Sequence, residues 1–328
     1  MTMPLLRTKE YKAALSLARH LNLSVPDLMA VLKSENGSYD FYHSWQEAKK
    51  SGGFRTYHSP LEPLRTFQQI IRERVLSRLP VSAIAHGYAK GKSIVTNADA
   101  HIKSRSLFAL DLSDAFGSTA LRYKLKQQQK TKSCLSLAEF GLTLPQFEVM
   151  LKLVEVLPMV NSEMQCLPFL PQGGITSPDI FNYCCHELDR RLLQLANNVG
   201  GKVTRYADNI FFSMPSIRVD NAIRNAVYRI VQECGFKLNR KKTHHIVNGN
   251  RNGVPLRLLG INIIDGDMYL PPETIERYRG LLYRAGLEAD HETFAWIKGV
   301  VIQVYGGWPP RLAGIYRKGL TKGGHLSP

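Results

Sequence analysis

Two acidic residues stand at positions where a carboxylate is chemically informative. Asp111 lies near the end of an apolar run, residues 106–112, that predicts a strand, and Asp208 lies between two β-rich runs in residues 203–214, which predict a hairpin. A carboxylate beside an apolar strand is costly unless it meets a cation or hydrogen-bond donors. The acids are 97 residues apart, so only a fold that sets the strand beside the hairpin brings them together. They would then offer the oxygen ligands that Mg²⁺ prefers, and two such ions about 3.5–4 Å apart can activate a hydroxyl and stabilise a leaving phosphate.

Two further segments fit a phosphate-bearing substrate. Leu170-Pro171-Gln172-Gly173 is a glycine-bearing loop ahead of a helix, where the backbone can approach a ligand closely. Asn239-Arg240-Lys241-Lys242-Thr243 is a basic segment whose lysines could meet a triphosphate. Taken singly, each feature has an ordinary interpretation, because an acid after a strand is usually a helix cap and Tyr206-Ala207-Asp208-Asn209 is also a plain turn sequence. Their combination and order favour a catalytic site.

The overall charge favours a polyanionic partner. The chain has 328 residues with 43 Lys+Arg against 27 Asp+Glu, a formal net charge of +16, and neutralised phosphates release counterions on binding. Ribosomal and membrane-surface proteins share this bias. Five cysteines without a CxxC pair predict reduced thiols, and the sequence has neither a secretory signal nor an apolar run of about 20 residues. We therefore expect a cytoplasmic protein without a membrane partner.

The periodicity of the chain predicts an α+β protein with a sheet covered by helices. The expected elements are a helix pair in residues 8–33, a hairpin with a Gly-Gly turn in 49–60, a helix in 64–79, a strand in 106–112, helices in 143–158 and 178–198, a hairpin with a four-residue tip in 203–214, a helix in 219–234, a basic strand-like segment in 236–247 and a helical C-terminal region of about 50 residues.

The ordered series of motifs resembles the reverse-transcriptase family of palm polymerases, and especially its bacterial retron-type branch. The resemblance covers residues 54–263. Its carriers, in chain order, are Arg55-Thr56-Tyr57-His58-Ser59-Pro60, Ala85-His86-Gly87-Tyr88, Asn97-Ala98-Asp99-Ala100-His101, the segment from Asp111 to Phe116, Leu170-Pro171-Gln172-Gly173, Tyr206-Ala207-Asp208-Asn209, Asn239-Arg240-Lys241-Lys242-Thr243 and Leu258-Leu259-Gly260.

The resemblance implies a right-hand polymerase fold with fingers, a palm built on an antiparallel sheet, and a thumb. The implied domains are an N-terminal helical extension in residues 1–48, fingers in 49–105, a palm in 106–265 with a finger insertion around 120–165, and a thumb in 266–328.

The resemblance also implies a role for each motif residue. The implied catalytic residues are Asp111, Asp208 and Asn209, and the implied ligands of two Mg²⁺ ions, with Mn²⁺ as a substitute, are Asp111, Leu112 and Asp208. The implied nucleotide-binding residues are Arg55, Asp114, Ala115, Phe116, Gln172, Gly173 and Lys242. The implied RNA- and DNA-binding residues are Asn97, His101, Lys241 and Arg257. Phe116 would lie under the sugar and exclude a 2′-hydroxyl, and Lys242, or its neighbour Lys241, would protonate pyrophosphate.

The function that the resemblance implies is RNA-directed DNA synthesis on a cognate structured non-coding RNA, as in retron msDNA synthesis for anti-phage defence. The implied partners are that RNA, the RNA–DNA duplex, dNTPs and a separate defence effector protein. Two departures from the family pattern leave alternatives open. Asn209 replaces the second acid of the usual YxDD box, which keeps a carbonyl ligand but gives up one negative charge, and this leaves open a degenerate RNA-binding scaffold with an inactive palm. Leu258-Leu259-Gly260 stands where retron enzymes carry VTG, which leaves open a divergent retron, or a defence reverse transcriptase outside the retrons with unusual priming or weak template dependence.

Overall fold

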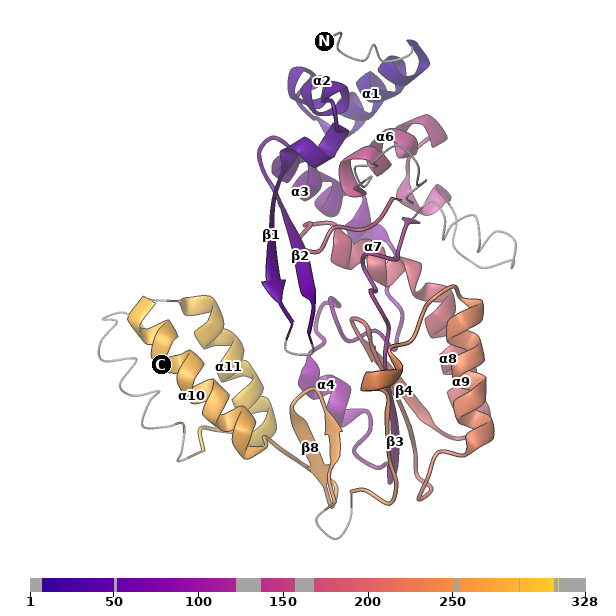
Figure 1. Cartoon of the computed structure of the whole chain (residues 1–328), viewed down its shortest axis with the longest axis vertical. Coiled ribbons are helices and arrows are strands. Elements are labelled where there is room, and N and C mark those ends of the chain that lie inside the picture. Colours follow the sequence, from indigo (N-terminus) through magenta and orange to yellow (C-terminus); the bar gives the residue numbers. More distant parts are fainter. Residues whose placement is uncertain are drawn as a thin grey trace. The chain divides into compact units, whose positions relative to one another are not determined.

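The computed structural model describes residues 8–49, 52–121, 137–156, 168–250, 254–288, 290–309 and 312 (Figure 1). The chain divides into two compact units. The first unit comprises Met1–Ala83, Leu112–Arg191 and Ile230–Lys237, and the second comprises Ile84–Asp111, Leu192–Arg229 and Leu238–Pro328. The chain therefore crosses from one unit to the other between Asp111 and Leu112, inside the first acidic motif.

The first unit combines helices with a two-stranded hairpin (Figure 1). Its elements are α1 (Thr8–Leu21), α2 (Val25–Lys33), η1 (Gly37–Phe41), β1 (Tyr42–Ala48), β2 (Phe54–Pro60), α3 (Leu64–Arg74), η2 (Leu76–Arg78), η3 (Leu137–Phe140), α6 (Leu144–Val154), α7 (Ser177–Cys184) and the start of α8 (His186–Asn198). Helix α1 packs against α6, α2 and α3 through a buried face that includes Leu17 and Leu21. The predicted helix pair in residues 8–33 is confirmed.

Three elements of the first unit differ from the sequence prediction. The hairpin starts at Tyr42, because β1 pairs with β2 from Tyr42↔Pro60 to Ala48↔Phe54. Its first strand is mostly exposed and polar, so no alternating pattern marks it. The predicted Gly-Gly turn is confirmed, since Gly52 and Gly53 both adopt positive φ angles. The helix predicted for residues 64–79 continues after Arg74 only as a short 3₁₀ turn, and the helix predicted for 178–198 is two helices that meet at Cys185.

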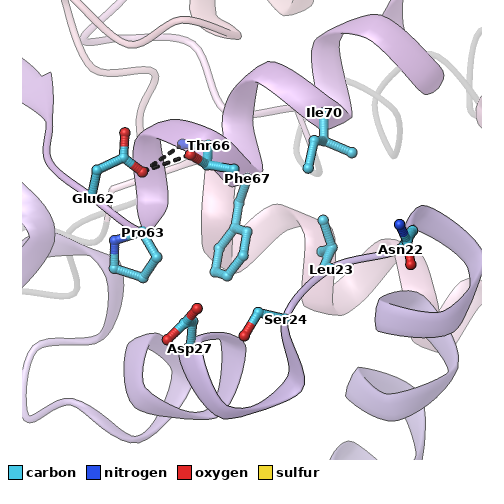
Figure 2. A pocket seen from close by; sticks show the side chains of 9 residues that line it. All are labelled: Asn22, Leu23, Ser24, Asp27, Glu62, Pro63, Thr66, Phe67 and Ile70. Carbon is cyan, nitrogen blue, oxygen red and sulfur yellow. Dashed lines mark hydrogen bonds between the residues drawn. The ribbon is translucent and has the colours of Figure 1, made fainter.

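A cavity of about 460 Å³ lies in the first unit beside the turn between α1 and α2 and the start of α3 (Figure 2). Leu23, Phe67 and Ile70 supply its apolar lining, and Asp27 and Glu62 supply carboxylates. Glu62 is already engaged, because its carboxylate accepts hydrogen bonds from the backbone N–H and the hydroxyl of Thr66. This carboxylate therefore serves the first turn of α3.

The second unit is built on a four-stranded antiparallel sheet in the order β4-β5-β3-β6. The sheet strands are β3 (Ser106–Asp111), β4 (Lys202–Tyr206), β5 (Asn209–Met214) and β6 (His244–Ile246). The other elements are α4 (Ile94–Asp99), α9 (Asn221–Glu233), η4 (Arg240–Lys242), β7 (Leu256–Leu258), β8 (Ile261–Ile264), β9 (Asp267–Tyr269), α10 (Pro272–Glu288) and α11 (His291–Tyr305). A boundary of the two units falls within α8 and another within α9.

Strand β3 is buried along its whole length, because both of its faces are covered. Leu107 and Ala109 belong to a core cluster with β7, β8, α4, α10 and α11. On the strand's other face, the ring of Phe108 meets Tyr228 of α9 edge-on, at 5.4 Å between centroids. A strand covered on both faces reads as a continuous apolar run, which is why residues 106–112 were predictable. No helix in the described part of the chain is long and apolar enough to cross a membrane.

Candidate active site

The sheet of the second unit brings the two predicted acids together. Strands β3 and β5 pair so that Asp111 lies opposite Asn209, the residue that follows Asp208. Asp111 is buried, with 9% of its side chain exposed, and Asp208 is half-buried. The expectation that the strand lies beside the hairpin is therefore confirmed.

The hairpin that carries Asp208 has a tighter tip than the sequence predicts. Tyr206 pairs with Asn209, so Ala207 and Asp208 alone form the turn, in place of the four-residue tip. Ala207 adopts a left-handed conformation with φ of 53°, which is unfavourable for a residue with a Cβ atom. Nη1 of the fully buried Arg205 donates to the carbonyl of Ala207 at 3.0 Å. Buried contacts thus hold the turn in a conformation that the sequence alone does not favour.

Asn209 makes a contact that the usual acid at this position could not make. Its Nδ2 donates a hydrogen bond to Oδ1 of Asp208 at 3.0 Å. An ionised carboxylate at position 209 would only accept hydrogen bonds, and it would repel Asp208. The substitution therefore gives up one negative charge and gains a donor that orients Asp208.

Lys242 pairs with the first acid. Its Nζ lies 3.0 Å from Oδ1 of Asp111, and about half of the lysine side chain is exposed. The short η4 turn places the lysine, and the backbone N–H of Asn239 donates to the carbonyl of Asp111 at 2.8 Å. The ion pair places Lys242, rather than Lys241, beside the first predicted acid.

The donor set fits hard divalent cations. Asp111 and Asp208 are carboxylates, and among the described residues no three His, Cys, Asp or Glu side chains gather as a metal cluster. Mg²⁺ is commonly held by one or two carboxylates, with waters and substrate phosphates completing its octahedron. One acid at the end of β3 and one in the adjacent β4-β5 turn suit that mode of binding better than a cage made by protein alone.

The first unit holds a cavity of about 280 Å³ with several of the predicted nucleotide-binding residues. Arg55, Asp114 and Gln172 line it, and Lys49 and His58 join them. Oε1 of Gln172 is buried and accepts no hydrogen bond from the described residues. This cavity therefore offers cationic side chains to a polar ligand.

The predicted glycine loop packs closely on β2. The backbone N–H of His58 donates to the carbonyl of Gln172 at 2.6 Å. Gly173 has a φ of 101°, and a Cβ atom there would lie 3.0 Å from the carbonyl oxygen of His58. Both observations explain why position 173 is a glycine, because the position requires a positive φ and a close approach of two backbone segments.

Two titratable groups of this cavity respond to their surroundings. Burial raises the pKa of Asp114, and the nearby Lys49 and Lys237 oppose that rise. Burial lowers the pKa of His58, whose Nδ1 lies 2.8 Å from the hydroxyl of Ser44. Sequence reasoning missed Lys49 and His58, although His58 lies in the resembling motif and on the same face of β2 as Thr56.

The remaining nucleotide-binding residues of the first acidic motif are partly or fully buried. Ala115 is buried, as is Leu112, which was predicted as a metal ligand, and the ring of Phe116 packs against Phe181 at 5.0 Å between centroids. A partly exposed ring that is supported on one face by another ring is held firmly, which suits a steric role.

The four residues predicted to contact nucleic acid divide into two pairs. Lys241 and Arg257 are exposed and remain available to phosphates. Asn97 and His101 are fully buried, and both ring nitrogens of His101 lie within hydrogen-bond distance of hydroxyls. Neither side chain reaches solvent, so the structure offers no exposed surface for the predicted RNA or DNA contact of Asn97 and His101, which stays a prediction.

Paired acids on an antiparallel sheet, with a lysine from the next segment, are typical of the palm of a metal-dependent nucleic-acid polymerase. The family model for reverse transcriptase (RNA-dependent DNA polymerase) matches residues 48–263. The retron Mx65 reverse transcriptase of Myxococcus xanthus is 32% identical over 264 residues, which cover 76% of this chain and 57% of that protein. The retron Ec73 reverse transcriptase of Escherichia coli is 31% identical over 208 residues, 60% of this chain and 62% of that protein.

The chain belongs to the reverse-transcriptase family, and its curated relatives identify the retron-type branch. The chain spans about three-fifths of the length of these relatives. The match, together with the observed helices and antiparallel sheet, agrees with the predicted α+β right-hand polymerase fold. A telomerase from Candida albicans, solved with a fragment of telomeric RNA, aligns with a TM-score of 0.49 and 11% identity over 86% of this chain and 55% of that one. That likeness is too low to carry an argument.

Proposed function

We propose that this protein is an RNA-directed DNA polymerase that extends a primer with dNTPs and uses two Mg²⁺ ions. The observation that carries the proposal is the register of β3 and β5, which puts Asp208 next to the residue opposite Asp111. Asp111 and Asp208 would hold the ions, with the backbone carbonyl of Leu112 as a third ligand. When bound, the ions would activate the primer hydroxyl and neutralise charge on the leaving pyrophosphate.

The protein's own groups supply the remaining functions. Lys242, already paired with Asp111, is a proton donor for the leaving pyrophosphate. Arg55 brings a positive charge to the cavity of the first unit, and Gln172 lines the same cavity. Lys241 and Arg257 are exposed cations for the backbone of the RNA–DNA duplex.

We extend the proposal to a cognate structured non-coding RNA as template, with msDNA synthesis in cytoplasmic anti-phage defence and a separate effector protein as partner. The names of the relatives as retron reverse transcriptases support this choice, and a net charge of +16 suits a nucleic-acid partner.

The proposal is tested by incubating the purified protein with the transcript encoded beside its gene and with labelled dNTPs. We expect labelled DNA of one fixed sequence, joined to that RNA, and no product after Mg²⁺ is chelated. Product of variable sequence, or product free of RNA, would favour the reverse transcriptase with unusual priming. Absence of any product with the transcript and with a generic RNA template and DNA primer would refute the polymerase.

Asn209 supports a second candidate function, an RNA-binding scaffold with an inactive palm. If the protein is a polymerase, the wild-type chain should synthesise DNA. Asn209→Asp should change the rate by less than about tenfold, because the variant loses the hydrogen bond to Asp208 but gains a carboxylate that can bind a metal ion. Single-nucleotide incorporation at several Mg²⁺ concentrations measures this. Synthesis by Asn209→Asp alone would identify the wild-type chain as the scaffold.

Phe116 should select deoxyribonucleotides. Its ring is supported by Phe181 at 5.0 Å, so Phe116→Val should open space for a 2′-hydroxyl and raise GTP use relative to dGTP by about tenfold or more. The ratio of kcat/KM for the two nucleotides measures the effect. The absolute kcat/KM for dGTP is the internal control and should fall only a few-fold. An unchanged ratio would mean that Phe116 does not lie under the sugar.

A further inference from the structure

A segment of the second unit runs along the strand that leads to Asp208. Ala85 forms a parallel bridge with Arg205, on the free edge of β4. The N–H of Arg205 donates to the carbonyl of Ile84, and the N–H of His86 donates to the carbonyl of Arg205, both at 2.7 Å. Residues 84–87 therefore extend the sheet beside the catalytic hairpin, although their sequence does not read as a strand.

Gly87 brings this segment against the hairpin tip. A Cβ atom at position 87 would lie 2.3 Å from the backbone nitrogen of Ala207 and 3.0 Å from the carbonyl carbon of Tyr206. A contact of 2.3 Å with backbone cannot be relieved by turning a side chain, so the tip or the segment would have to move. Ala207 immediately precedes Asp208, and Arg205 already holds its carbonyl oxygen. The left-handed turn is thus held at its carbonyl by Arg205 and confined at its nitrogen by Gly87.

His101, at the end of the same region, links the two strands of the hairpin. Its Nε2 lies 2.8 Å from the hydroxyl of Thr204 on β4, and its Nδ1 lies 2.6 Å from the hydroxyl of Ser213 on β5. Burial, with smaller contributions from His86 and Lys202, lowers the pKa of His101 to about 3. The neutral ring can donate one hydrogen bond and accept the other.

The region is itself anchored at its middle. Nδ1 of His86 lies 2.9 Å from the hydroxyl of Thr96. Thr96 also belongs to the capping box with Ser93 that begins α4. Residues 84–104 therefore contact β4 near the hairpin tip through Ala85, and they contact both β4 and β5 through His101.

We infer that residues 84–104 form a brace that fixes the catalytic hairpin, and that Gly87 is a positioning residue for Asp208. The inference rests on the proposed function for its kinetic consequence alone. It gives the segment that resembles the retron signature a role in placing a catalytic acid, where sequence reasoning expected RNA contact.

The test compares Gly87→Ala with Gly280→Ala, a control on α10 where an added Cβ atom would meet nothing within 4 Å. The first readout is amide hydrogen exchange of residues 203–213 in the full-length protein. Gly87→Ala should speed exchange at the hairpin tip by at least about tenfold, whereas Gly280→Ala should leave it unchanged. This readout needs no activity, so it judges the brace even if the protein synthesises no DNA.

The second readout is steady-state DNA synthesis. Gly87→Ala should lower kcat by about a hundredfold, because a displacement of about 1 Å at a reacting group costs that much. The KM for dNTP and the affinity for RNA should stay within about twofold, and the Mg²⁺ concentration for half-maximal rate should rise. Loss of RNA affinity with unchanged exchange and kcat would instead identify an RNA-binding segment.

A second variant covers the case in which Gly87→Ala does not fold. His101→Gln keeps one N–H donor and one acceptor but changes their geometry, so it should also speed exchange in β4 and β5 and lower kcat at constant KM. His291→Gln, at the exposed start of α11, is its matched control. Wild-type exchange and wild-type kcat in either folded variant would overturn the brace.

Discussion

Replacing Asp208 with asparagine should lower the rate of DNA synthesis by about a thousandfold, or roughly 4 kcal/mol of transition-state stabilisation. Asparagine has almost the same size, and its carbonyl can still accept the hydrogen bond from Asn209. The variant therefore removes a charge and leaves the turn intact. Because position 209 is already an amide, Asp111 would be the one carboxylate left among the three predicted catalytic side chains, too few for two divalent ions.

The measurement is the rate of single-nucleotide incorporation at saturating dNTP, with Mg²⁺ and then Mn²⁺. Asp220→Asn is the matched control, because Asp220 is an exposed acid paired with Arg218 at 3.3 Å. An exposed pair contributes little, so the control should keep the wild-type rate within about twofold. A rate for Asp208→Asn above one tenth of wild type, with Asp220→Asn unchanged, would remove Asp208 from the metal site.

The sequence was informative about this pair of acids because each lies next to a pattern that predicts one kind of element, a strand for Asp111 and a hairpin for Asp208. A six-residue apolar run such as β3 can be buried on both faces, and two β-rich runs around a short polar tip form a hairpin. What the sequence could not supply was the register. Asp111 lies opposite Asn209 because of how β3 and β5 pair, and register is set by tertiary packing as much as by local pattern.

The sequence was least informative where a residue acts through the backbone. Gly87 looks like an ordinary loop glycine, and nothing local indicates that it confines the nitrogen of Ala207. The burial of Asn97 and His101 was not predicted for a related reason. A motif of polar residues suggests an exposed surface, but His101 is buried with Thr204 and Ser213 as partners 103 and 112 residues away. Arg205 was also overlooked. Arginines are rarely fully buried, so its sequence position gave no sign that its side chain lies in the interior.

His101 should make the stability of the protein fall steeply in acid. Its native pKa is about 3, against about 6.5 in an unfolded chain. Between these values the unfolded chain binds more protons than the native protein, so the contribution of His101 is complete above pH 6.5 and is lost as the pH falls toward 3. At pH 4 the loss should be on the order of 3 kcal/mol relative to pH 7.

Urea titrations of the wild type and of His101→Gln at pH 7 and pH 4 measure this effect. Glutamine does not titrate, so the variant should lose about 3 kcal/mol less than the wild type between the two pH values, although it is less stable at pH 7. His86, whose pKa burial and Lys92 lower to about 4, is present in both proteins, and because it also lowers the pKa of His101, the measured difference includes the coupling between the two histidines. The prediction is contradicted if wild type and His101→Gln lose the same free energy of unfolding between pH 7 and pH 4. His101 would then be protonated in the native protein as readily as in the unfolded chain, despite its hydrogen bonds to β4 and β5.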